Sequence, residues 1–328
     1  MGLRVGVIGT GRLGREHVRV LKKVPEVEHV ACYDIVSEKS RRVAEAFGAE
    51  PYSDVRKLMR DVDAVSVVVP TVRHTEVSLQ ALEHGNNLFL EKPIAASVSE
   101  AVRIIDTARK LRRVLQVGHI ERFNAAIREA LPHIKRPSFI EIHRLAPFTV
   151  RGIDVSVIMD LMIHDIDLLT WFLDAKPNDI RAKGAGILTN GPDIVNARLE
   201  YDGGCVANLT ASRVSVEPMR KVRIFSETSY LSIDLLRGSI KHFRKGNKFD
   251  EHVHNLKNGH VDLVDISLHD VLAIDETKIE GEEPLFQELQ SFCQTVSNGE
   301  APAVSGEDGL TALQVATEIQ DKSQLSNR

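Results

Sequence analysis

Three glycines near the start of the chain have the spacing of a phosphate-binding turn. Gly9, Gly11 and Gly14 form the pattern GxGxxG in the segment GTGRLG, directly after a strand-like run and at the start of a helical pattern. Glycine allows the backbone to turn sharply there and to approach a pyrophosphate at the helix N-terminus. Asp34 ends the next strand-like run, where a carboxylate accepts hydrogen bonds from an adenosine ribose. Together they predict a dinucleotide site; the alternative is a glycine turn beside a solvated Asp.

The carboxylate of Asp34 favours NAD over NADP, because it would repel a 2'-phosphate. Basic and hydroxyl residues soon after it soften this preference, namely Ser37, Lys39, Arg41 and Arg42. We therefore expect NAD, with NADP less favoured. Further cofactor contacts are expected from the glycine loop and from the loops after two later strands, at Thr10, Arg12, Leu13, Pro70, Thr71, His74, Glu91 and Lys92.

Lys92 is the first residue whose position suggests a role in chemistry. It follows a predicted strand, in the tripeptide Glu91-Lys92-Pro93. Open α/β folds bind ligands at the carboxyl edge of the sheet, which is where this tripeptide would lie. A Lys in that place can hold a substrate hydroxyl or carbonyl oxygen and exchange a proton with it. A solvated surface cation is the alternative interpretation.

Two domains are predicted from the pattern of elements. Short β-branched runs alternate with helical stretches at first, and the expected strands are 3–8, 29–33, 64–69, 87–90 and 114–117. This alternation predicts a doubly wound Rossmann domain with a parallel sheet over residues 1–119. Residues 120–328 are expected to form an α+β domain with a large, open, mainly antiparallel sheet.

The elements expected in the second domain begin with helices near 121–133 and 159–172. The strands follow at 139–144, 195–201, 206–213, 222–226 and 230–233, with a hairpin signal at 202–204. Two helical stretches, 284–297 and 307–322, end the chain. The last helix, about 305–322, is expected to pack back on the first domain.

Composition narrows the class of protein. The 328 residues are 43% hydrophobic and 27% charged, with a formal net charge of -4. No basic stripe is present that would neutralise a nucleic-acid backbone, and no apolar run approaches the ~20 residues of a membrane helix. Three cysteines without CxxC spacing suggest neither a disulfide framework nor a zinc site. We expect a cytoplasmic protein without a metal, nucleic-acid or membrane partner.

Four histidines offer a metal site as an alternative. His252 and His254 would share one face of a strand, and His260 and His269 follow. A polar, exposed loop and strand is the interpretation we favour, because the ligand spacing is not tight.

These motifs resemble the glucose-fructose oxidoreductase and inositol dehydrogenase family, known as Gfo/Idh/MocA. The resemblance covers essentially the whole chain, in GTGRLG, VPTVRHTEVSLQALEHGNNLFLEKPIA, DLMIHDIDLLTWF and VSGEDGLTALQVA. It implies an NAD(P)-dependent oxidoreductase acting on CH–OH groups. It also implies that Lys92 contacts the reacting oxygen and that the Lys92-Pro93 peptide bond is commonly cis.

A second catalytic element is implied by the resemblance at Asp160 and His164. Four residues apart, they would share one face of a helix. His164 would take the hydroxyl proton, while Asp160 binds the substrate or orients the site. The alternatives are a helix-start Asp with an interior His, or a shared metal, for which no third ligand is evident. Many members carry a glycine run before this Asp, whereas here the segment is DVSVIM, residues 154–159.

Within the family, the stretch VGHIERFN and the helix DLMIHDIDL look most like the nucleotide-sugar dehydrogenases. These oxidise the 3-hydroxyl of UDP-N-acetylglucosamine or its uronic acid. Arg122, Asn124, Asp160 and His164 are the substrate-binding candidates. The planar guanidinium group of Arg can donate two hydrogen bonds to one phosphate, which suits a diphosphate. Further candidate donors are therefore Arg144, Arg213 and Arg220.

Three other functions stay open at this point: a dehydrogenase of a free polyol or sugar, a non-catalytic NAD-binding sensor, and a glycosidase that uses NAD transiently. The open sheet would leave a broad face to cover, and in the family such faces pair between subunits. We therefore expect a homodimer or homotetramer.

Overall fold

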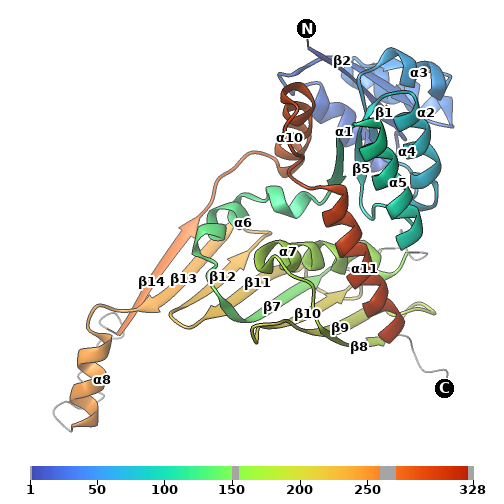
Figure 1. Cartoon of the computed structure of the whole chain (residues 1–328). Helices are drawn as coiled ribbons and strands as arrows, with labels where there is room; N and C mark the ends of the chain where they lie inside the picture. Colours follow the sequence, from blue (N-terminus) through green and yellow to red (C-terminus); the bar gives the residue numbers. More distant parts are fainter. Residues whose placement is uncertain (1, 150–154, 259–270, 324–328) are drawn as a thin grey trace. The chain divides into compact units, whose positions relative to one another are not determined.

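The computed structural model describes residues 2–149, 155–258 and 271–323, and the chain forms two compact units (Figure 1). The first comprises Met1–Phe123 and Glu282–Thr317, and the second comprises Asn124–Gly281 and Glu318–Arg328. The expected division at residue 119 put residues 282–304 in the second domain, whereas they lie in the first unit. The reason is that helix α10 (Pro284–Asn298) contributes to the first unit's core.

The first unit contains the predicted parallel sheet, in the order β3-β2-β1-β4-β5-β6. The strands are β1 (Leu3–Ile8), β2 (Val27–Tyr33), β3 (Glu50–Pro51), β4 (Ala64–Val67), β5 (Asn87–Glu91) and β6 (Leu115–Gly118). All neighbouring strands pair in parallel. Strand order reverses at β1, because β2 lies on one side of it and β4 on the other. This is the point where doubly wound sheets bind ligands at their carboxyl edge.

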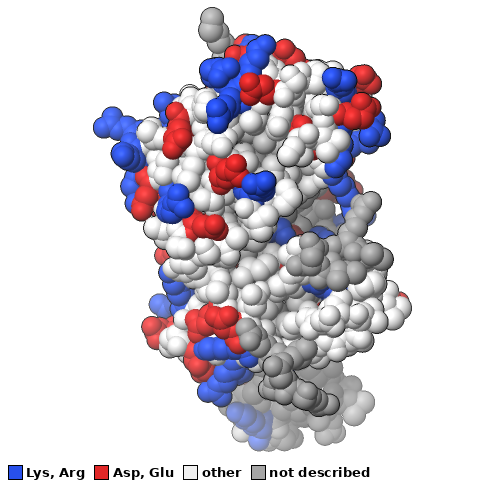
Figure 2. All heavy atoms as spheres, turned by 90° about the vertical axis from the view of Figure 1, so that its right-hand side faces the viewer, with Lys and Arg blue, Asp and Glu red and all other residues white. Residues whose placement is uncertain are grey.

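The helices that connect these strands are α1 (Arg12–Leu21), α2 (Ser37–Phe47), α3 (Val55–Asp61), α4 (His74–Glu83) and α5 (Val98–Leu111), with the short 3-10 turn η1 (Thr71–Arg73) before α4. The 3-10 turn η2 (Ile120–Phe123) follows β6, and helix α11 (Gly306–Lys322) belongs to this unit as far as Thr317. Phe292 of α10 packs edge-on against Phe89 of β5, with ring centroids 5.7 Å apart. Leu289 and Cys293 are buried in the same cluster as Val5. On the face that Figure 2 shows, acidic and basic side chains are interspersed.

The second unit is built on an eight-stranded sheet in the order β14-β13-β12-β11-β7-β10-β9-β8. Its strands are β7 (Pro137–Leu145), β8 (Asp179–Ala185), β9 (Ile194–Glu200), β10 (Val206–Ser212), β11 (Met219–Ser226), β12 (Ser229–Asp234), β13 (Ser239–Lys245) and β14 (Leu272–Lys278). The expected antiparallel character is confirmed, with the exception of β7 and β10, which pair in parallel. The predicted hairpin at residues 202–204 joins β9 to β10.

Two helical regions lie over one face of this sheet (Figure 1). The first is α6 (Ala125–Ala130) with the 3-10 turn η3 (Leu131–His133), and the second is a π-helix (Ile158–Met162) that continues into α7 (Ile163–Leu173). A single helix was predicted near 121–133, but Asn124 caps a new helix there by accepting a hydrogen bond from the amide of Ala126. On β7, Ile140 and Ile142 are buried on the helical side, while Phe139 and Glu141 alternate onto the opposite face.

The strand expected at His252 and His254 is wrong. Both residues lie on helix α8 (Phe249–Lys257), where residues two apart point in different directions. His260 and His269 fall outside the described residues. In the described part of the chain, no three His, Cys, Asp or Glu side chains are grouped so as to hold a metal ion. No described helix is both long enough and apolar enough to span a bilayer.

Candidate functional site

The glycine loop between β1 and α1 has the shape that a pyrophosphate needs. Gly9 has a φ of +94°, and a Cβ there would lie 2.4 Å from the carbonyl oxygen of Val68. A Cβ at Gly14 would lie 1.8 Å from the carbonyl oxygen of Gly9, so only glycine allows the loop to fold tightly onto α1. Gly11 is the N-cap of α1 and provides no side chain to accept from the helix's first amides. These amides are therefore available to an anionic ligand.

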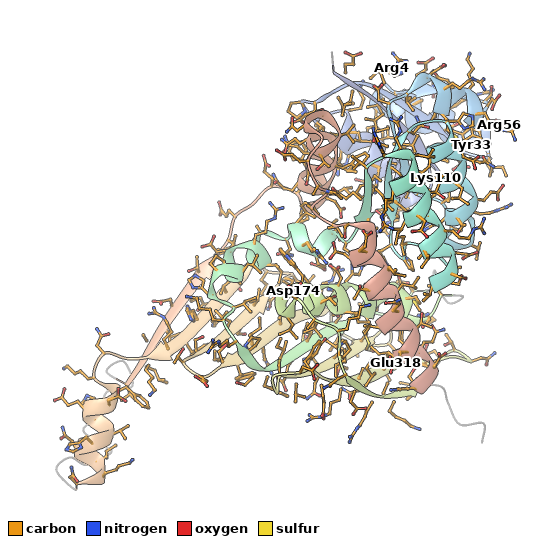
Figure 3. All side chains as sticks on the ribbon, in the orientation of Figure 1. Arg4, Tyr33, Arg56, Lys110, Asp174 and Glu318 are labelled. Atoms are coloured by element: carbon orange, nitrogen blue, oxygen red, sulfur yellow. The ribbon has the colours of Figure 1, made fainter. Side chains whose placement is uncertain are left out.

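Asp34 lies where the sequence predicted, just beyond Tyr33, which ends β2 (Figure 3). Its Oδ2 accepts hydrogen bonds from the amide (2.8 Å) and hydroxyl (3.2 Å) of Thr10, and its Oδ1 accepts from the amide of Val36 (2.9 Å). Thr10 is therefore committed to holding the carboxylate in place. A carboxylate has about four acceptor positions, so Asp34 retains capacity for a ribose hydroxyl.

Exposed apolar side chains surround this edge of the sheet. Leu13 of α1 is 45% exposed, Ile35 and Val36 after β2 are 86% and 47% exposed, and Val72 after β4 is 75% exposed. All four follow the carboxyl ends of adjacent strands. Such residues fit the apolar base of a dinucleotide, a signal that the motif spacing alone did not provide. Together with the uncapped amides of α1, they show that the residues present fit NAD.

Lys92 follows β5 at the same edge of the sheet and is half-buried. The peptide bond between Lys92 and Pro93 is cis, as the resemblance implied. The amide of Lys92 donates to Oε2 of Glu91 over 3.2 Å. Glu91 is only 8% exposed, so its carboxylate faces the interior of the first unit. This burial argues against the cofactor contact that we predicted for Glu91.

His17 is a buried partner of Glu91 that the sequence interpretation missed. It lies on α1 with its side chain fully buried, and its Nε2 is 3.1 Å from Oε1 of Glu91. Its Nδ1 is 2.8 Å from Oγ of Ser66 on β4. A single His in an apolar helix resembles an ordinary core residue. The polar Ser66 inside the otherwise apolar run AVSV was the signal that could have indicated a partner.

The loop after β4 carries Pro70, Thr71 and His74. Pro70 is exposed and Thr71 is half-buried, which leaves both accessible to a cofactor. His74 is 1% exposed, with Nδ1 2.8 Å from the carbonyl of Pro93 and Nε2 3.0 Å from the carbonyl of Val69. Its side chain therefore braces two loops, and a direct cofactor contact from it is not supported. Burial lowers the pKa of His74, against the opposing effect of these carbonyls.

The second unit carries Asp160 and His164. Asp160 lies in the π-helix and His164 in the first turn of α7, and both are half-buried while the neighbouring Met162 and Ile163 are buried. Short π-helical segments occur frequently at functional sites. The amide of Asp160 donates to the carbonyl of Ser156 over 2.9 Å. The predicted helix is thus present, with Asp160 and His164 on its accessible side.

An ion pair beneath this helix was not predicted. Arg144 of β7 and Asp165 of α7 are both almost fully buried. Nε of Arg144 lies 3.0 Å from each carboxylate oxygen of Asp165, and Nη2 lies 2.6 Å from Oδ1. The pair anchors the residue next to His164 to the sheet. Arg144 is therefore buried and paired with Asp165, which argues against the phosphate contact that we predicted for it.

The other substrate-binding candidates have structural partners as well. Arg122 belongs to the first unit, is 5% exposed, and places Nη2 3.1 Å from Oδ1 of Asp308. Asn124 caps α6. Arg213 donates to the carbonyl of Val155 over 2.5 Å. Arg220 is exposed on β11. Lys92 and Arg122 thus lie in the first unit, and Asn124, Asp160 and His164 in the second.

Comparison with known proteins places both units in one family. Residues 3–119 match the model of the oxidoreductase family with an NAD-binding Rossmann fold, and residues 105–232 match the Gfo/Idh/MocA C-terminal domain. The chain is 36% identical to UDP-N-acetylglucosamine 3-dehydrogenase of Acidithiobacillus ferrooxidans over 83% of this chain and 86% of that protein. It is 25% identical to myo-inositol 2-dehydrogenase of Thermotoga maritima, over 95% of this chain and 93% of that protein.

Solved structures agree with this assignment. The structure of the Acidithiobacillus UDP-N-acetylglucosamine 3-dehydrogenase aligns with a TM-score of 0.87 and 31% identity, covering 98% of each chain. A scyllo-inositol dehydrogenase from Lactobacillus casei, with bound NAD(H) and scyllo-inositol, aligns with a TM-score of 0.78 over 98% of this chain and 97% of that one. At 19% identity, the latter likeness concerns the fold alone.

Proposed function

Because the chain belongs to the Gfo/Idh/MocA oxidoreductase family, we propose that it oxidises C3 of a UDP-N-acetylglucosamine-type nucleotide sugar. The family has an NAD-binding Rossmann fold, and its curated relatives are dehydrogenases of CH–OH groups. The observation that carries the choice of substrate is the likeness to a UDP-N-acetylglucosamine 3-dehydrogenase, which extends across 98% of both chains and so includes the second unit.

Lys92 is the residue of the first unit that we assign to the reaction. Bound NAD supplies the acceptor for the hydride that leaves the sugar carbon. Lys92 donates a hydrogen bond to the reacting oxygen and stabilises the negative charge that develops there. Its place at the carboxyl end of β5, where doubly wound sheets bind ligands, supports this role.

His164 and Asp160 are the residues of the second unit that we assign to the reaction. His164 accepts the hydroxyl proton, since an imidazole can change its charge near neutral pH. Asp160 orients the site or binds the sugar. Their half-buried positions on the π-helix and the first turn of α7 support these roles, because neither side chain is enclosed in the core.

The test is NAD reduction at near-stoichiometric enzyme with UDP-N-acetylglucosamine, its uronic acid, inositol or glucose, followed by the absorbance of NADH. We expect reduction with a UDP-sugar that is lost in Lys92→Ala and in His164→Ala. Lys110→Ala is the matched control, because Lys110 is an exposed residue on α5 (Figure 3).

The other outcomes of this assay identify the rival functions. Reduction with inositol or glucose only would contradict the nucleotide-sugar assignment and favour a free-polyol dehydrogenase. NAD binding without reduction of any substrate would contradict the dehydrogenase assignment and favour a sensor or an NAD-using glycosidase. Retained activity in both Ala variants would remove Lys92 and His164 from the mechanism.

A homo-oligomer is the assembly that we propose, formed through the sheet face opposite α6 and α7. An aromatic ladder crosses four strands on that face: Phe139, Phe225, Tyr230 and Phe243 follow one another in register, with centroid distances of 5.9, 4.5 and 4.9 Å. Acidic and basic side chains lie beside the aromatic ladder, in the pairs Arg223–Glu141 and Lys241–Glu276. A surface with both signs of charge suits a self-complementary contact between two copies. Light scattering should show a multimer, and Tyr230→Glu should shift it towards a monomer.

A cytoplasmic location is also part of the proposal. It is supported by the three cysteines, Cys32, Cys205 and Cys293, which are buried free thiols rather than disulfide partners.

A further inference from the structure

We propose that His17 is a positioning residue for Lys92, acting through Glu91. This inference rests on the proposed function, because it assigns His17 a role in presenting the Lys92 side chain. The chain of contacts runs from Ser66 on β4 to His17 on α1, then to Glu91 at the end of β5, and finally to the backbone amide of Lys92. Three elements of the first unit thus converge on one amide.

The contacts form a continuous chain of polar groups, in which hydrogen bonds join Ser66 to His17 and the Lys92 amide to Glu91. Oε2 of Glu91 accepts from the amide of Lys92 at 3.2 Å, and Oε1 faces Nε2 of His17 at 3.1 Å. The contact between Nε2 and Oε1 is a close polar contact without the alignment of a hydrogen bond, whereas Nδ1 of His17 shares a hydrogen bond of 2.8 Å with the hydroxyl of Ser66. Each oxygen of Glu91 therefore has one defined neighbour.

Burial of the Glu91 carboxylate at the end of β5 destabilises the fold unless polar groups contact it. The preceding residues of β5, Leu88, Phe89 and Leu90, are apolar and fully buried, and another apolar side chain would continue the strand. Burying a charged group without partners is unfavourable, so His17 and the Lys92 amide must compensate for it. The neighbouring strand provides space as well: a Cβ at Gly118 would lie 3.1 Å from three carboxyl atoms of Glu91.

The other side of the Lys92-Pro93 pair is held in the same manner. Nδ1 of His74 lies 2.8 Å from the carbonyl oxygen of Pro93. Main-chain groups are thus fixed on both sides of the Lys92 Cα, by Glu91 before it and by His74 after it. The backbone from which the Lys92 side chain extends is consequently held on both sides.

The experiment compares His17→Phe with Phe292→Leu. Both residues pack edge-on against the ring of Phe89, at 5.6 and 5.7 Å, but only His17 reaches Glu91. We expect His17→Phe to lower the single-turnover rate of NAD reduction about 30- to 100-fold with a small change in NAD affinity, because misplacement by about 1 Å can cost 10²-fold. Phe292→Leu should lower the melting temperature and leave the rate within about twofold. His17→Gln, which keeps a donor towards Glu91, should recover part of the rate.

A double-mutant cycle separates positioning from general damage. In a Lys92→Met background, His17→Phe should have little further effect on the rate, because the residue it positions is gone. A full additional loss in that background would overturn the proposal. If His17→Phe does not fold, the same cycle is carried out with Ser66→Ala, for which an about threefold to tenfold loss is expected and independence from Lys92 would again overturn it.

A readout that needs no turnover keeps this inference separate from the proposed function. Acylation of Lys92 by an amine-reactive ester, followed by peptide mass spectrometry and referenced to Lys110, should be about threefold faster or more in His17→Phe than in wild type or Phe292→Leu. Equal labelling rates would contradict the positioning role even in an enzyme that is active. Conversely, faster labelling of Lys92 in a His17→Phe protein that reduces no NAD with any sugar would support the positioning role while the proposed function fails.

Discussion

The two units hold their proposed reactive side chains by different means. In the first unit, Lys92 is fixed through the main chain. The carboxylate of Glu91 accepts a hydrogen bond from the Lys92 amide, and the ring of His74 contacts the carbonyl oxygen of Pro93. In the second unit, His164 is fixed through its neighbour, because Asp165 is tied to Arg144 by a buried ion pair. The first arrangement constrains the backbone at the reactive residue itself, whereas the second fixes a whole helix against a sheet.

This difference has an energetic consequence. Contacts around Lys92 are distributed over β4, β5, α1 and α4, so the loss of one leaves the others in place. The second unit concentrates its anchoring in one pair of charges, and removing one partner leaves an uncompensated charge in the interior. Loss of the Glu91 contact with the Lys92 amide should therefore appear mainly in the reaction rate, and loss of the pair between Arg144 and Asp165 mainly in stability.

The largest effect is expected for Lys92→Met. We expect a loss of about 10³-fold in kcat/KM, because the variant lacks the donor to the reacting oxygen. The melting temperature should change little, since Lys92 is half-exposed and its backbone contacts remain. Steady-state kinetics and thermal denaturation measure the two quantities. A large loss of stability in Lys92→Met would contradict the difference that we infer between the two units.

Next in size is the cost of breaking the ion pair by Arg144→Met. The free energy of unfolding should fall by about 3 kcal/mol, because Asp165 would stay buried without its partner. The double variant Arg144→Met, Asp165→Leu should recover most of this loss, since no charge is left in the interior. Urea denaturation compares the three proteins, and a double variant as unstable as the single one would refute this account of the anchor.

A smaller effect is expected at Asp193, which fixes the loop between β8 and β9. Burial would raise the pKa of Asp193, but hydrogen bonds from the amides of Leu188 and Ile187 and from Thr189 outweigh it and hold the pKa at about 2. Asp193→Asn should lower the free energy of unfolding by about 1–3 kcal/mol at pH 7. Because the folded pKa is below its unfolded value, this stabilisation is present above about pH 4 and is lost as the pH falls towards 2. Urea unfolding of both proteins across that range should show the difference shrinking.

The smallest effect is expected for His74, as a change in how steeply the free energy of unfolding depends on pH. Burial lowers the pKa of its imidazole below the unfolded value of about 6.5. As the pH falls through 6.5, the unfolded chain binds a proton that the folded protein does not yet bind, so the free energy of unfolding decreases. His74→Leu should be less stable at pH 7 but should lose less stability between pH 7 and 5 than wild type. An unchanged slope in urea titrations would exclude His74 as a contributor.

The sequence predicted the first unit well because its signals are local. β1 is bounded by the glycine loop, and its range agrees with the prediction at both ends. β3 was missed because it consists of only two residues, Glu50 and Pro51, which have no strand pattern. In the second unit, the strand ranges that we named correspond to β7, β9, β10, β11 and β12. No range was named for β8, β13 or β14, since their exposed, charged faces mask the alternation of apolar and polar residues.

The site was predicted in part, for a similar reason. Asp34, Lys92 and Asp160 follow from motif spacing, together with the resemblance for the last. The supporting contacts do not, because they join residues far apart in the chain: His17 meets Glu91 and Arg144 meets Asp165 only after folding. Because such contacts are not visible in the sequence, Arg144 was predicted as a donor to a phosphate. A formal charge in a sequence carries no information about its partner.

Helix α10 has a consequence for the order in which the protein can mature. Leu285, Leu289, Phe292 and Cys293 belong to the same buried cluster as Val5 and Phe89, although nearly three hundred residues of sequence separate the two ends of that cluster. During synthesis on the ribosome, the dinucleotide-binding unit emerges first but has an unfilled apolar side until α10 emerges. A fragment that stops at residue 123 should therefore expose that side, and we expect it to require a chaperone or to aggregate.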